Sequence, residues 1–400
     1  MSKIEELIQK YCPDGVEYKR FGDIATLEKG KGLQKTDFTD EGIGCIHYGQ
    51  IYTHFGISTT ETLTCTSAEK AKKFTVVHPG DIVMASTSEN VEDCGKSVVW
   101  LGSDDIVTGG HSIVIRTKQN PMYLAYVLQT PWFQKQKVKK VYGVKVIEFK
   151  PDELADIVIP VPPLPVQQEI VRILDSFTSL QDELQKELEE RKSQIRLLLN
   201  SMMQFPMAEE KPIGELLSVC RGASPRPISK YIVPSGIHWI KIGDVKPGEK
   251  YITDTEQFVS QDGAKKSRLV KPGDLIMSNS MSYGRPYIMK ISGCIHDGWL
   301  LVSNYEDSYT TEFLYYLLRS DRVQKQFSKK ASSGTVSNLN ADIVRSVQVP
   351  VPTFEEQNAI VEKLSIFDEY NTAVKKEIMF RQQQYTYYRD KLLSFPRKEV

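Results

Sequence analysis

The sequence predicts an α+β protein in which two homologous mixed α/β domains are each followed by a long coiled-coil helix. Three observations support this fold class: an internal repeat at an offset of 190 residues, short β-like runs separated by turn residues, and two long stretches with a helical apolar stripe. Residues 157–206 align without a gap with residues 347–396, and 14 of the 50 positions are identical. A gap-free repeat of this period indicates duplication of a whole domain with its helix, rather than a solenoid of short repeats.

Composition limits the class of protein. The chain has 400 residues, of which 40% are hydrophobic and 26% charged, enough for two or three domains with their own cores. It has no run of 18 apolar residues, and its start, MSKIEELIQKYC, lacks an apolar core. We therefore expect no membrane span, no signal peptide and a cytoplasmic location. The six cysteines include no Cys-x-x-Cys pair, which predicts free, mostly buried thiols and no metal site.

The formal net charge is zero, which on its face argues against nucleic acid as a partner, because neutralising phosphates requires Lys and Arg. The charge is unevenly distributed along the chain, however. Residues 165–210 carry 5 basic and 9 acidic side chains, whereas residues 211–354 carry 19 basic and 13 acidic ones. A local basic surface is therefore compatible with the neutral total.

The two globular halves show the same order of elements. A Pro-Gly-Asp turn at 79–81 precedes an apolar run that predicts a buried strand over 82–85, and VKPGDLIMSNS at 270–280 repeats this pattern. An amphipathic helix is predicted over 122–140, and the matching stretch is 313–330. The loops between these elements differ, so the halves should share a scaffold and differ at their surfaces.

The two long helical stretches carry apolar residues at alternating spacings of three and four. An extra step of four occurs at Leu184–Leu188 and again at Val374–Ile378, and such matched stutters indicate that the helices pack against each other. The first helix is predicted over 166–204, a rod of roughly 58 Å. Arg191 and Arg381 interrupt the stripe at the same place, either as snorkelling rim residues or as cross-pairs with an acidic neighbour.

Prolines precede both helices, and Phe-Pro pairs follow them. The repeated segments PVPPLPVQQEIV and PVPTFEEQNAIV, at the end of globular halves that contain Pro-Gly-Asp strands, resemble the specificity subunit of type I restriction-modification systems. The likeness covers essentially the whole chain. One departure is that the family helix usually begins with Glu-Gln, as in Glu356-Gln357, whereas the first copy has Val166-Gln167.

The resemblance implies a pseudo-twofold molecule in which two target recognition domains are separated by two long antiparallel coiled-coil helices. The expected bounds are 1–159 for the first target recognition domain, 160–206 for the first conserved spacer helix, 207–349 for the second domain and 350–400 for the second spacer helix. Each domain would read one part of a bipartite, asymmetric double-stranded DNA site. Because the loops of the two halves differ, the two half-sites should differ as well.

Members of this family are not enzymes, so the resemblance implies that the activity resides in partner subunits. The helices would dock two methyltransferase subunits, which would bind S-adenosylmethionine, and restriction subunits that translocate DNA can add to these; no cofactor and no membrane contact are expected for this chain. Neither an amino-methyltransferase motif nor a nucleotide phosphate loop occurs in the sequence. Two other classes stay open: a coiled-coil adaptor that binds only proteins, which the zero net charge favours, and an active nuclease or methyltransferase.

Candidate DNA contacts follow from side-chain chemistry. Short hydrogen-bonding residues and an arginine after the two Pro-Gly-Asp strands suit base edges, and lysines at the predicted helix ends suit phosphates. The Ala-Ser-Ser-Gly-Thr tract at 331–335 allows close backbone approach. Turn chemistry, a solvated helix face and a plain linker are the respective alternatives. The candidates are Ser86, Thr87, Ser88, Asn90, Ser278, Asn279, Ser280, Tyr283 and Arg285 for bases, with Gln50 and Lys241 as weaker ones; Lys139, Lys140, Lys145, Lys329 and Lys330 for phosphates; and Ser333 and Thr335 in the tract.

The proline-rich starts of the two long helices are the candidate subunit-docking surface. This set comprises Pro160, Pro162, Gln167, Pro350, Pro352 and Gln357. We expect no metal ligands, because Cys45-x-His47 and Cys294-x-His296 have no second ligand pair at zinc spacing. His111 and His296 are expected to be loop or core residues.

Overall fold

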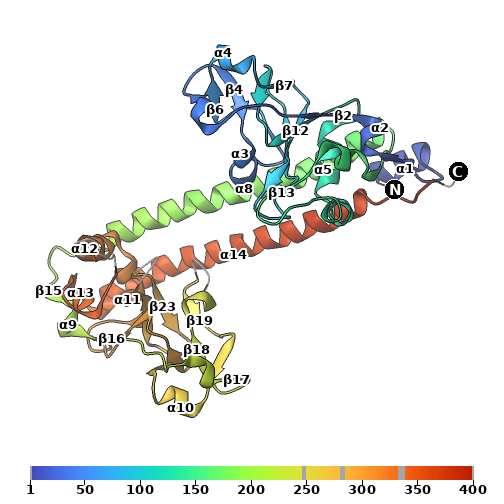
Figure 1. Ribbon diagram of the computed structural model, residues 1–400. Coiled ribbons are helices and arrows are strands. Elements are labelled where there is room, and N and C mark those ends of the chain that lie inside the picture. Colours follow the sequence, from blue (N-terminus) through green and yellow to red (C-terminus); the bar gives the residue numbers. More distant parts are fainter. Residues whose placement is uncertain (1, 246–248, 280–283, 332–337, 399–400) are drawn as a thin grey trace. The chain divides into compact units, whose positions relative to one another are not determined.

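The computed structural model of the chain describes residues 2–245, 249–279, 284–331 and 338–398 (Figure 1). The chain forms two compact units, one made of Met1–Leu184 with Glu377–Val400 and the other of Gln185–Lys376, here called the first and second unit. Each unit therefore contains one globular domain and a part of both long helices. No helix in the described ranges is both long and apolar enough to span a bilayer.

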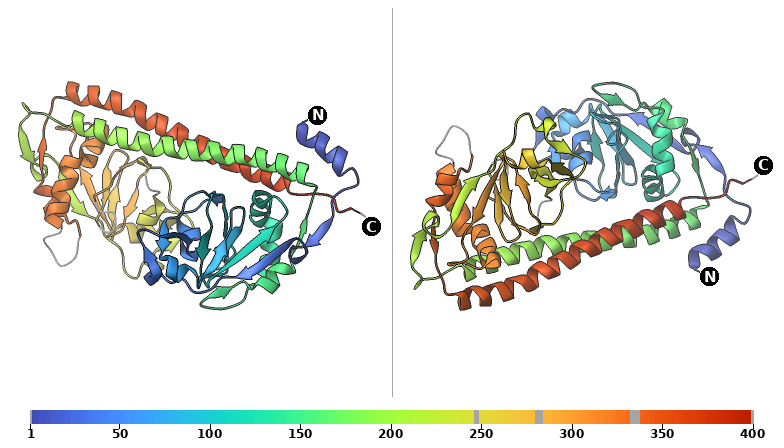
Figure 2. Two further views of the ribbon diagram at one scale, coloured as in Figure 1. Left: turned by 90° about the horizontal axis from the view of Figure 1, so that it is seen from above. Right: turned by 90° about the horizontal axis from the view of Figure 1, so that it is seen from below.

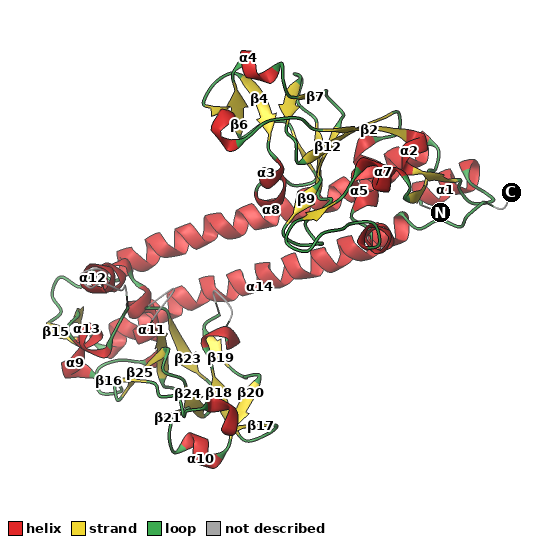
Figure 3. Ribbon diagram, in the orientation of Figure 1, coloured by secondary structure: helices red, strands yellow, loops and turns green. Residues whose placement is uncertain are grey.

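The globular part of the first unit contains two five-stranded mixed sheets, ordered β2-β12-β8-β10-β5 and β3-β6-β4-β11-β7 (Figure 3). Its elements are α1 (Lys3–Tyr11), β1 (Tyr18–Arg20), α2 (Phe21–Ile24), β2 (Ala25–Lys29), η1 (Lys35–Asp37), β3 (Phe38–Thr39), β4 (Ile43–Ile46), α3 (Tyr48–Thr53), β5 (Ser58–Thr59), β6 (Thr64–Thr66), α4 (Ala68–Ala71), β7 (Thr75–Val77), β8 (Ile82–Ala85), β9 (Thr87–Ser88), β10 (Ser97–Trp100), β11 (Ile106–Thr108), β12 (Ser112–Thr117), α5 (Pro121–Leu128), α6 (Pro131–Val138), β13 (Ile147–Glu148), α7 (Pro151–Ala155) and β14 (Val158–Pro160).

The second unit repeats this topology, with sheets ordered β16-β25-β22-β23-β19 and β17-β20-β18-β24-β21. Its elements are β15 (Glu210–Pro212), α9 (Ile213–Leu216), β16 (Ser218–Arg221), η2 (Ile228–Lys230), β17 (Ile232–Val233), β18 (Ile237–Ile240), η3 (Ile242–Asp244), β19 (Tyr251–Ile252), β20 (Gln257–Val259), α10 (Gln261–Ala264), β21 (Arg268–Val270), β22 (Leu275–Ser278), β23 (Pro286–Met289), β24 (Gly293–Ile295), β25 (Trp299–Ser303), α11 (Thr311–Arg319), α12 (Asp321–Ala331), α13 (Ala341–Arg345) and β26 (Gln348–Pro350). The pairing directions also match, because β10·β5 and β19·β23 are parallel while β8 and β22 are antiparallel to both neighbours.

The strand after each Pro-Gly-Asp turn lies at the centre of its sheet and confirms the strand predicted over 82–85. Gly80 adopts φ +90°, which glycine tolerates without a steric penalty. The Asp81 carboxylate accepts the His78 N–H at 2.9 Å and closes the turn. In the second unit Gly273 has φ +95° and Asp274 accepts the Lys271 N–H at 2.8 Å.

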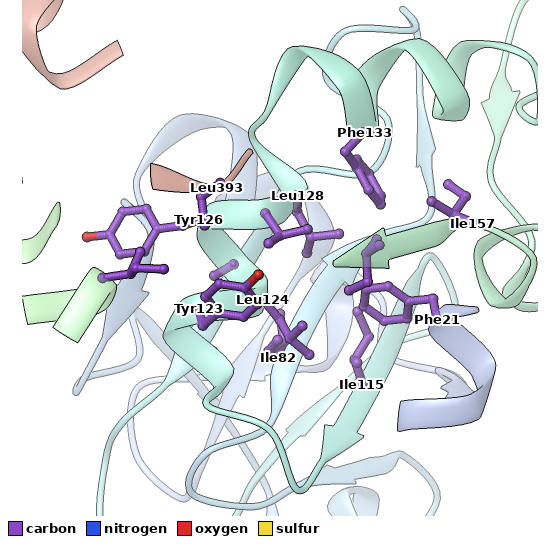
Figure 4. Close-up of a cluster of buried hydrophobic side chains, with 14 of the residues drawn as sticks. Phe21, Ile82, Ile115, Tyr123, Leu124, Tyr126, Leu128, Phe133, Ile157 and Leu393 are labelled. Carbon is purple, nitrogen blue, oxygen red and sulfur yellow. The ribbon is translucent and has the colours of Figure 1, made fainter. Parts of the chain in front are cut away.

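These central strands are apolar throughout because both of their faces are covered. Ile82 and Met84 belong to the core beneath the helices, whereas Val83 and Ala85 belong to the core between the two sheets. Alternate residues of a strand point to opposite faces, so a strand between two cores needs an uninterrupted apolar run. Figure 4 shows how α5 contributes Tyr123, Leu124, Tyr126 and Leu128 to the first of these cores.

The prediction of one helix over 122–140 is wrong in one respect, because the chain forms two helices there, α5 and α6. Thr130 caps α6 by accepting the Phe133 N–H at 3.3 Å, and Pro131 occupies the first helical turn. A proline there has no N–H for a continuing helix, so the chain breaks and restarts. The second unit breaks between α11 and α12 at Ser320, without a proline.

The long helices are α8 (Leu164–Met202) and α14 (Phe354–Leu392), each of 39 residues, within two residues of the predicted bounds for the first. In Figure 2 the ribbons of α8 and α14 are green and red. In the first unit the rings of Phe177 and Tyr388 stack at 5.4 Å. In the second unit the Tyr370 hydroxyl donates to Glu187 at 3.0 Å. Early residues of one helix thus meet late residues of the other in both units, so the helices run antiparallel, as expected.

The two arginines that interrupt the apolar stripe pair with acids on their own helix. Arg191 contacts Glu187 at 3.0 Å and lies 4.0 Å from the centroid of the Tyr370 ring. Arg381 contacts Glu377 at 2.7 Å. An i,i+4 pair of this kind contributes a few tenths of a kcal/mol, about 0.3–0.5. The predicted cross-pair is therefore wrong for both arginines, because the glutamate that each one contacts lies one turn earlier on its own helix rather than on the opposite helix.

A buried glutamine joins the domain to its long helix in the first unit. The Gln167 side-chain oxygen accepts the N–H of Asn120, the N-cap of α5, at 3.0 Å. Its amide nitrogen donates to the Pro162 carbonyl at 2.7 Å and to Gln119 at 2.8 Å. Gln167 is fully buried, and a buried amide is tolerated only when its hydrogen bonds are made.

Gln357 makes the same junction in the second unit. Its oxygen accepts the N–H of Thr310, the N-cap of α11, at 2.8 Å, and its nitrogen donates to the Ser308 and Pro352 carbonyls at 2.8 and 3.0 Å. The residue before the glutamine differs between the two repeats, Glu356 in the second and Val166 in the first, and each fits its surroundings. Glu356 and Thr353 exchange hydrogen bonds as a capping box, whereas Val166 is buried.

We predict that Gln357→Leu destabilises the protein by about 2–3 kcal/mol, because it leaves the Thr310 N–H and two carbonyls without partners. Urea unfolding of the full chain measures this. The control is Asn358→Leu, the next residue on the same turn, whose side chain is exposed. Equal stabilities of the two variants would contradict the junction.

Candidate nucleic-acid interface

In the first unit, the polar tract after β8 is partly internal. Ser86 is 1% exposed and Thr87 is 9% exposed, with the Thr87 hydroxyl 3.0 Å from Nδ1 of His111. Asn90 is exposed, but its amide bonds both the backbone and the carboxylate of Asp93. The Asn90 N–H in turn donates to the Ser88 hydroxyl at 3.4 Å. The contacts of Ser88 and Asn90 are those of an ordinary turn. Ser86 and Thr87 lie inside the domain rather than at its surface.

The corresponding tract of the second unit is described only in part. Ser278 and Asn279 are buried, and the Asn279 side chain donates to the Asp297 carbonyl at 2.9 Å. Arg285 is exposed. The candidates Ser280, Tyr283, Ser333 and Thr335 lie outside the described residues.

Matching hydrogen bonds place these two tracts at the same edge of their domains. The Ser86 N–H donates to the His111 carbonyl at 2.9 Å, and the Asn279 N–H donates to the Gly298 carbonyl at 3.0 Å. Beside each of these hydrogen-bonded pairs, two backbone segments pass very close to each other. A Cβ on Gly30 would be 1.8 Å from the Gly109 oxygen, and one on Gly222 would be 2.1 Å from the His296 oxygen, so only glycine fits either position.

At this edge the first unit carries a group of rings, here called the ring cluster: Phe38, His47, Tyr48 and His111. The His47 and Tyr48 centroids are 4.4 Å apart, Tyr48 and His111 4.9 Å, and Phe38 and His47 5.7 Å. Burial lowers the pKa of His47 below its usual value, so its ring is neutral at neutral pH. His111 is exposed and Tyr48 half-buried, so the cluster presents ring surfaces to solvent.

The second unit carries an arginine cluster organised by Asp297. The Asp297 carboxylate accepts the Ser224 hydroxyl at 2.8 Å and an Arg226 guanidinium N–H at 3.1 Å. Its backbone carbonyl accepts Nε of Arg221 at 2.9 Å as well as the Asn279 amide. The hydrogen bond from Ser224, followed by the charge of Arg226, lowers the pKa of Asp297. The Arg226 side chain is 81% exposed, so Asp297 holds one face of it and leaves the rest to solvent.

Two hollows flank Asp297. One, of about 700 Å³, is lined by Trp239, His296, Lys241, Arg226 and neighbouring prolines. The other, of about 330 Å³, is lined by Arg221, Asn279 and Asn340. The candidates Lys241, which follows β18, and Asn279, which follows β22, thus line different hollows, both of which include Asp297. Burial lowers the pKa of His296, whose Nδ1 accepts the Gly298 N–H at 2.6 Å.

Sequence reasoning missed Arg221, Arg226 and Asp297, because Asp297 lies more than 70 residues after Arg221, Ser224 and Arg226 along the chain. One signal was available: the stretch RGASPRP places two arginines around a glycine and prolines, in register with Gly30 of the first half. A loop of that composition predicts an ordered turn that exposes its arginines.

The lysine candidates and Gln50 differ in their exposure and in the contacts that their side chains make. Lys139 and Lys145 are exposed. Lys140 contacts Glu153 at 2.9 Å and Asp156 at 3.4 Å, and Lys330 donates to the Ser346 carbonyl at 3.0 Å. The remaining two candidates are Lys329, which lies in the last turn of α12, and Gln50, whose amide accepts the His47 N–H and donates to Thr64.

The candidate docking residues all lie inside the protein. Their side chains are buried, and the carbonyls of Pro160 and Pro350 accept the hydroxyls of Tyr123 and Tyr309 at 3.0 and 2.7 Å. They therefore hold the domains to the helices; their role in subunit docking stays a prediction. Among the described residues no three His, Cys, Asp or Glu side chains gather as a metal site, and four of the six free cysteines are buried.

Comparison with known proteins adds independent information. The model of the type I restriction modification DNA specificity domain matches twice, over residues 13–191 and 208–379. The specificity subunit of the Escherichia coli type I restriction enzyme EcoR124I/EcoR124II is 29% identical over 250 residues, which cover 59% of this chain and 61% of that subunit. The specificity subunit of the MjaVIII enzyme from Methanocaldococcus jannaschii is 23% identical over 398 residues, covering 91% of this chain and 89% of the relative.

Solved structures share the fold. The type I restriction-modification S subunit from M. genitalium aligns with a TM-score of 0.56 at 15% identity, covering 95% of this chain and 96% of that one. A chain from work on complex assembly and conformational transition of the type I R-M system aligns with a TM-score of 0.61 at 18% identity, covering 97% and 99%. The two domain matches together span well over half of the sequence, and the chain therefore belongs to the type I restriction-modification DNA specificity domain family.

Proposed function

We propose that this chain is the non-catalytic specificity subunit of a type I restriction-modification complex, and that it reads a bipartite, asymmetric double-stranded DNA site. In this proposal it recruits two methyltransferase subunits, which bind S-adenosylmethionine, and restriction subunits where the system has them. The observation that carries the proposal is the matched edge of the two domains: one scaffold presents a ring cluster in one unit and an arginine cluster in the other. The cytoplasmic location stays a prediction.

The two edges suit different bases. Arginine forks onto the O6 and N7 acceptors of guanine, and a carboxylate that fixes one side of the guanidinium orients the other side. Arg226, held by Asp297, has this arrangement. Aromatic ring surfaces instead make apolar contacts, for example with a thymine methyl group. Matched edges with unlike chemistry support half-sites of unlike sequence.

We predict that replacing residues 1–155 with the equivalent segment of a relative changes only one half of the methylated sequence, because each domain carries its own edge. The measurement is sequencing of methylated bases in a host that expresses the hybrid with its methyltransferase partner. A swap that altered both half-sites, or left methylation unchanged, would exclude modular reading. A chain that binds only proteins would leave the methylation pattern independent of both domains.

We further predict that Arg226→Ala, assayed in the complex with its methyltransferase, weakens binding to the cognate duplex by about 10- to 100-fold, as expected for the loss of one bidentate base contact. Binding to unrelated duplexes should change much less. The control is Lys265→Ala, which removes a 75% exposed cation from the same unit. Equal losses on all sequences would assign Arg226 to phosphate rather than to a base.

A further inference from the structure

The second unit contains another hollow, here called the basic pocket, which shares no lining residue with the two hollows beside Asp297. Its volume is about 330 Å³. Four cationic side chains and one carboxylate line it, together with the aromatic wall of Tyr315. The charged residues are Lys192 of α8, Lys375 of α14, Arg285 before β23, Arg319 at the end of α11, and Glu249.

The structure holds Arg319 in place at the wall of the pocket. Its guanidinium donates to the Tyr315 hydroxyl at 2.9 Å and lies 5.0 Å from the centroid of the Tyr315 ring. Tyr315 is 4% exposed, and burial raises its pKa to about 12, so the hydroxyl stays protonated and uncharged. An arginine stacked on a buried ring loses little further freedom when it binds an anion.

The first unit shows that folding does not require these charges. At the repeat offset of 190 residues, Arg319, Lys375 and Lys192 correspond to Gln129, Gln185 and Gln382. Gln129 and Gln382 lie in the first unit, whereas Gln185 is the first residue of the second unit. In the first unit, neutral amides make the contacts at these positions. Gln129 accepts the Tyr385 hydroxyl at 3.0 Å, and Gln382 accepts the Gln181 amide at 2.9 Å. Like charges around one hollow repel each other, so cations that the scaffold does not need indicate an anionic ligand.

We propose that the basic pocket binds a phosphate group of the DNA backbone and anchors the second domain to DNA independently of sequence. The proposal rests on the proposed DNA-binding function. Arginine forks and lysine ammonium groups both match phosphate oxygens. Four cations against one carboxylate line the pocket, and its charge stays positive when Glu189, which contacts Lys192 at 2.6 Å, is also counted. Phosphate contacts of this kind position a protein on the duplex without reading bases.

The test uses the triple variant Lys192→Gln, Arg319→Gln and Lys375→Gln, which installs the amides that the repeat carries at the corresponding positions and should therefore fold. Affinity is measured against salt concentration on cognate and unrelated duplexes, in the complex with methyltransferase. We expect an equal loss on both sequences, about tenfold or more, a salt slope lower by about 1 for each phosphate contact removed, and an unchanged methylated sequence. The control is Lys265→Gln, Lys271→Gln and Lys325→Gln, three exposed cations of the same unit outside the pocket.

Each other outcome overturns the proposal. A loss on the cognate duplex alone would make the pocket a base-reading site, and a loss equal to that of the control would make it ordinary surface charge. Inorganic phosphate that raises the unfolding temperature of the wild type but not of the triple variant, with DNA affinity unchanged, would assign the pocket to a free anion. Wild-type complex that binds neither duplex would instead refute the proposed function.

Discussion

The structure depends on a buried amide at the place where each domain meets its long helix. Gln167 and Gln357 are fully buried, and each joins the N-cap of a domain helix to the proline-rich segment that starts α8 or α14. A buried amide destabilises the fold unless its donors and acceptors are satisfied, so the helix start, the proline carbonyl and the N-cap can coexist only in this geometry. The prolines restrict the chain further, because their φ angles are fixed. The junction thereby fixes the direction in which each long helix leaves its domain.

The duplicated scaffold makes the differences between the units informative. Both domains have the same sheet order, the same Pro-Gly-Asp turn and the same glycine crossing at the edge. Selection for folding alone explains features that both units share. It does not explain why one edge carries rings and the other arginines, or why glutamines of one helix junction are replaced by cations in the other. Those are the positions where function is expected to act.

Local patterns in the sequence predicted the local structure well. The strand over 82–85 and the long helices depend on an apolar run, a turn and a period, all of which lie within a few residues. The break at Thr130-Pro131 was missed because the apolar period continues through it, although the proline marked it. The site was predicted less well, since burial of Ser86 and Gln167 and the gathering of Arg221, Arg226 and Asp297 depend on residues distant in sequence. Periodicity carries no information about such contacts.

The zero net charge of the chain, the best argument against nucleic acid, loses its force at the level of individual sites. Charges on a protein surface act over about 10 Å at 0.1 M salt, so a phosphate responds to its immediate surroundings rather than to the total. Residues 211–354 carry 19 basic and 13 acidic side chains, while residues 165–210 carry 5 and 9. In the second unit Asp297 and Tyr315 hold the arginines Arg226 and Arg319 at defined positions, where cations are most effective toward a polyanion. A neutral total combined with fixed local cations limits indiscriminate attraction to DNA and leaves binding to depend on the fit at these sites.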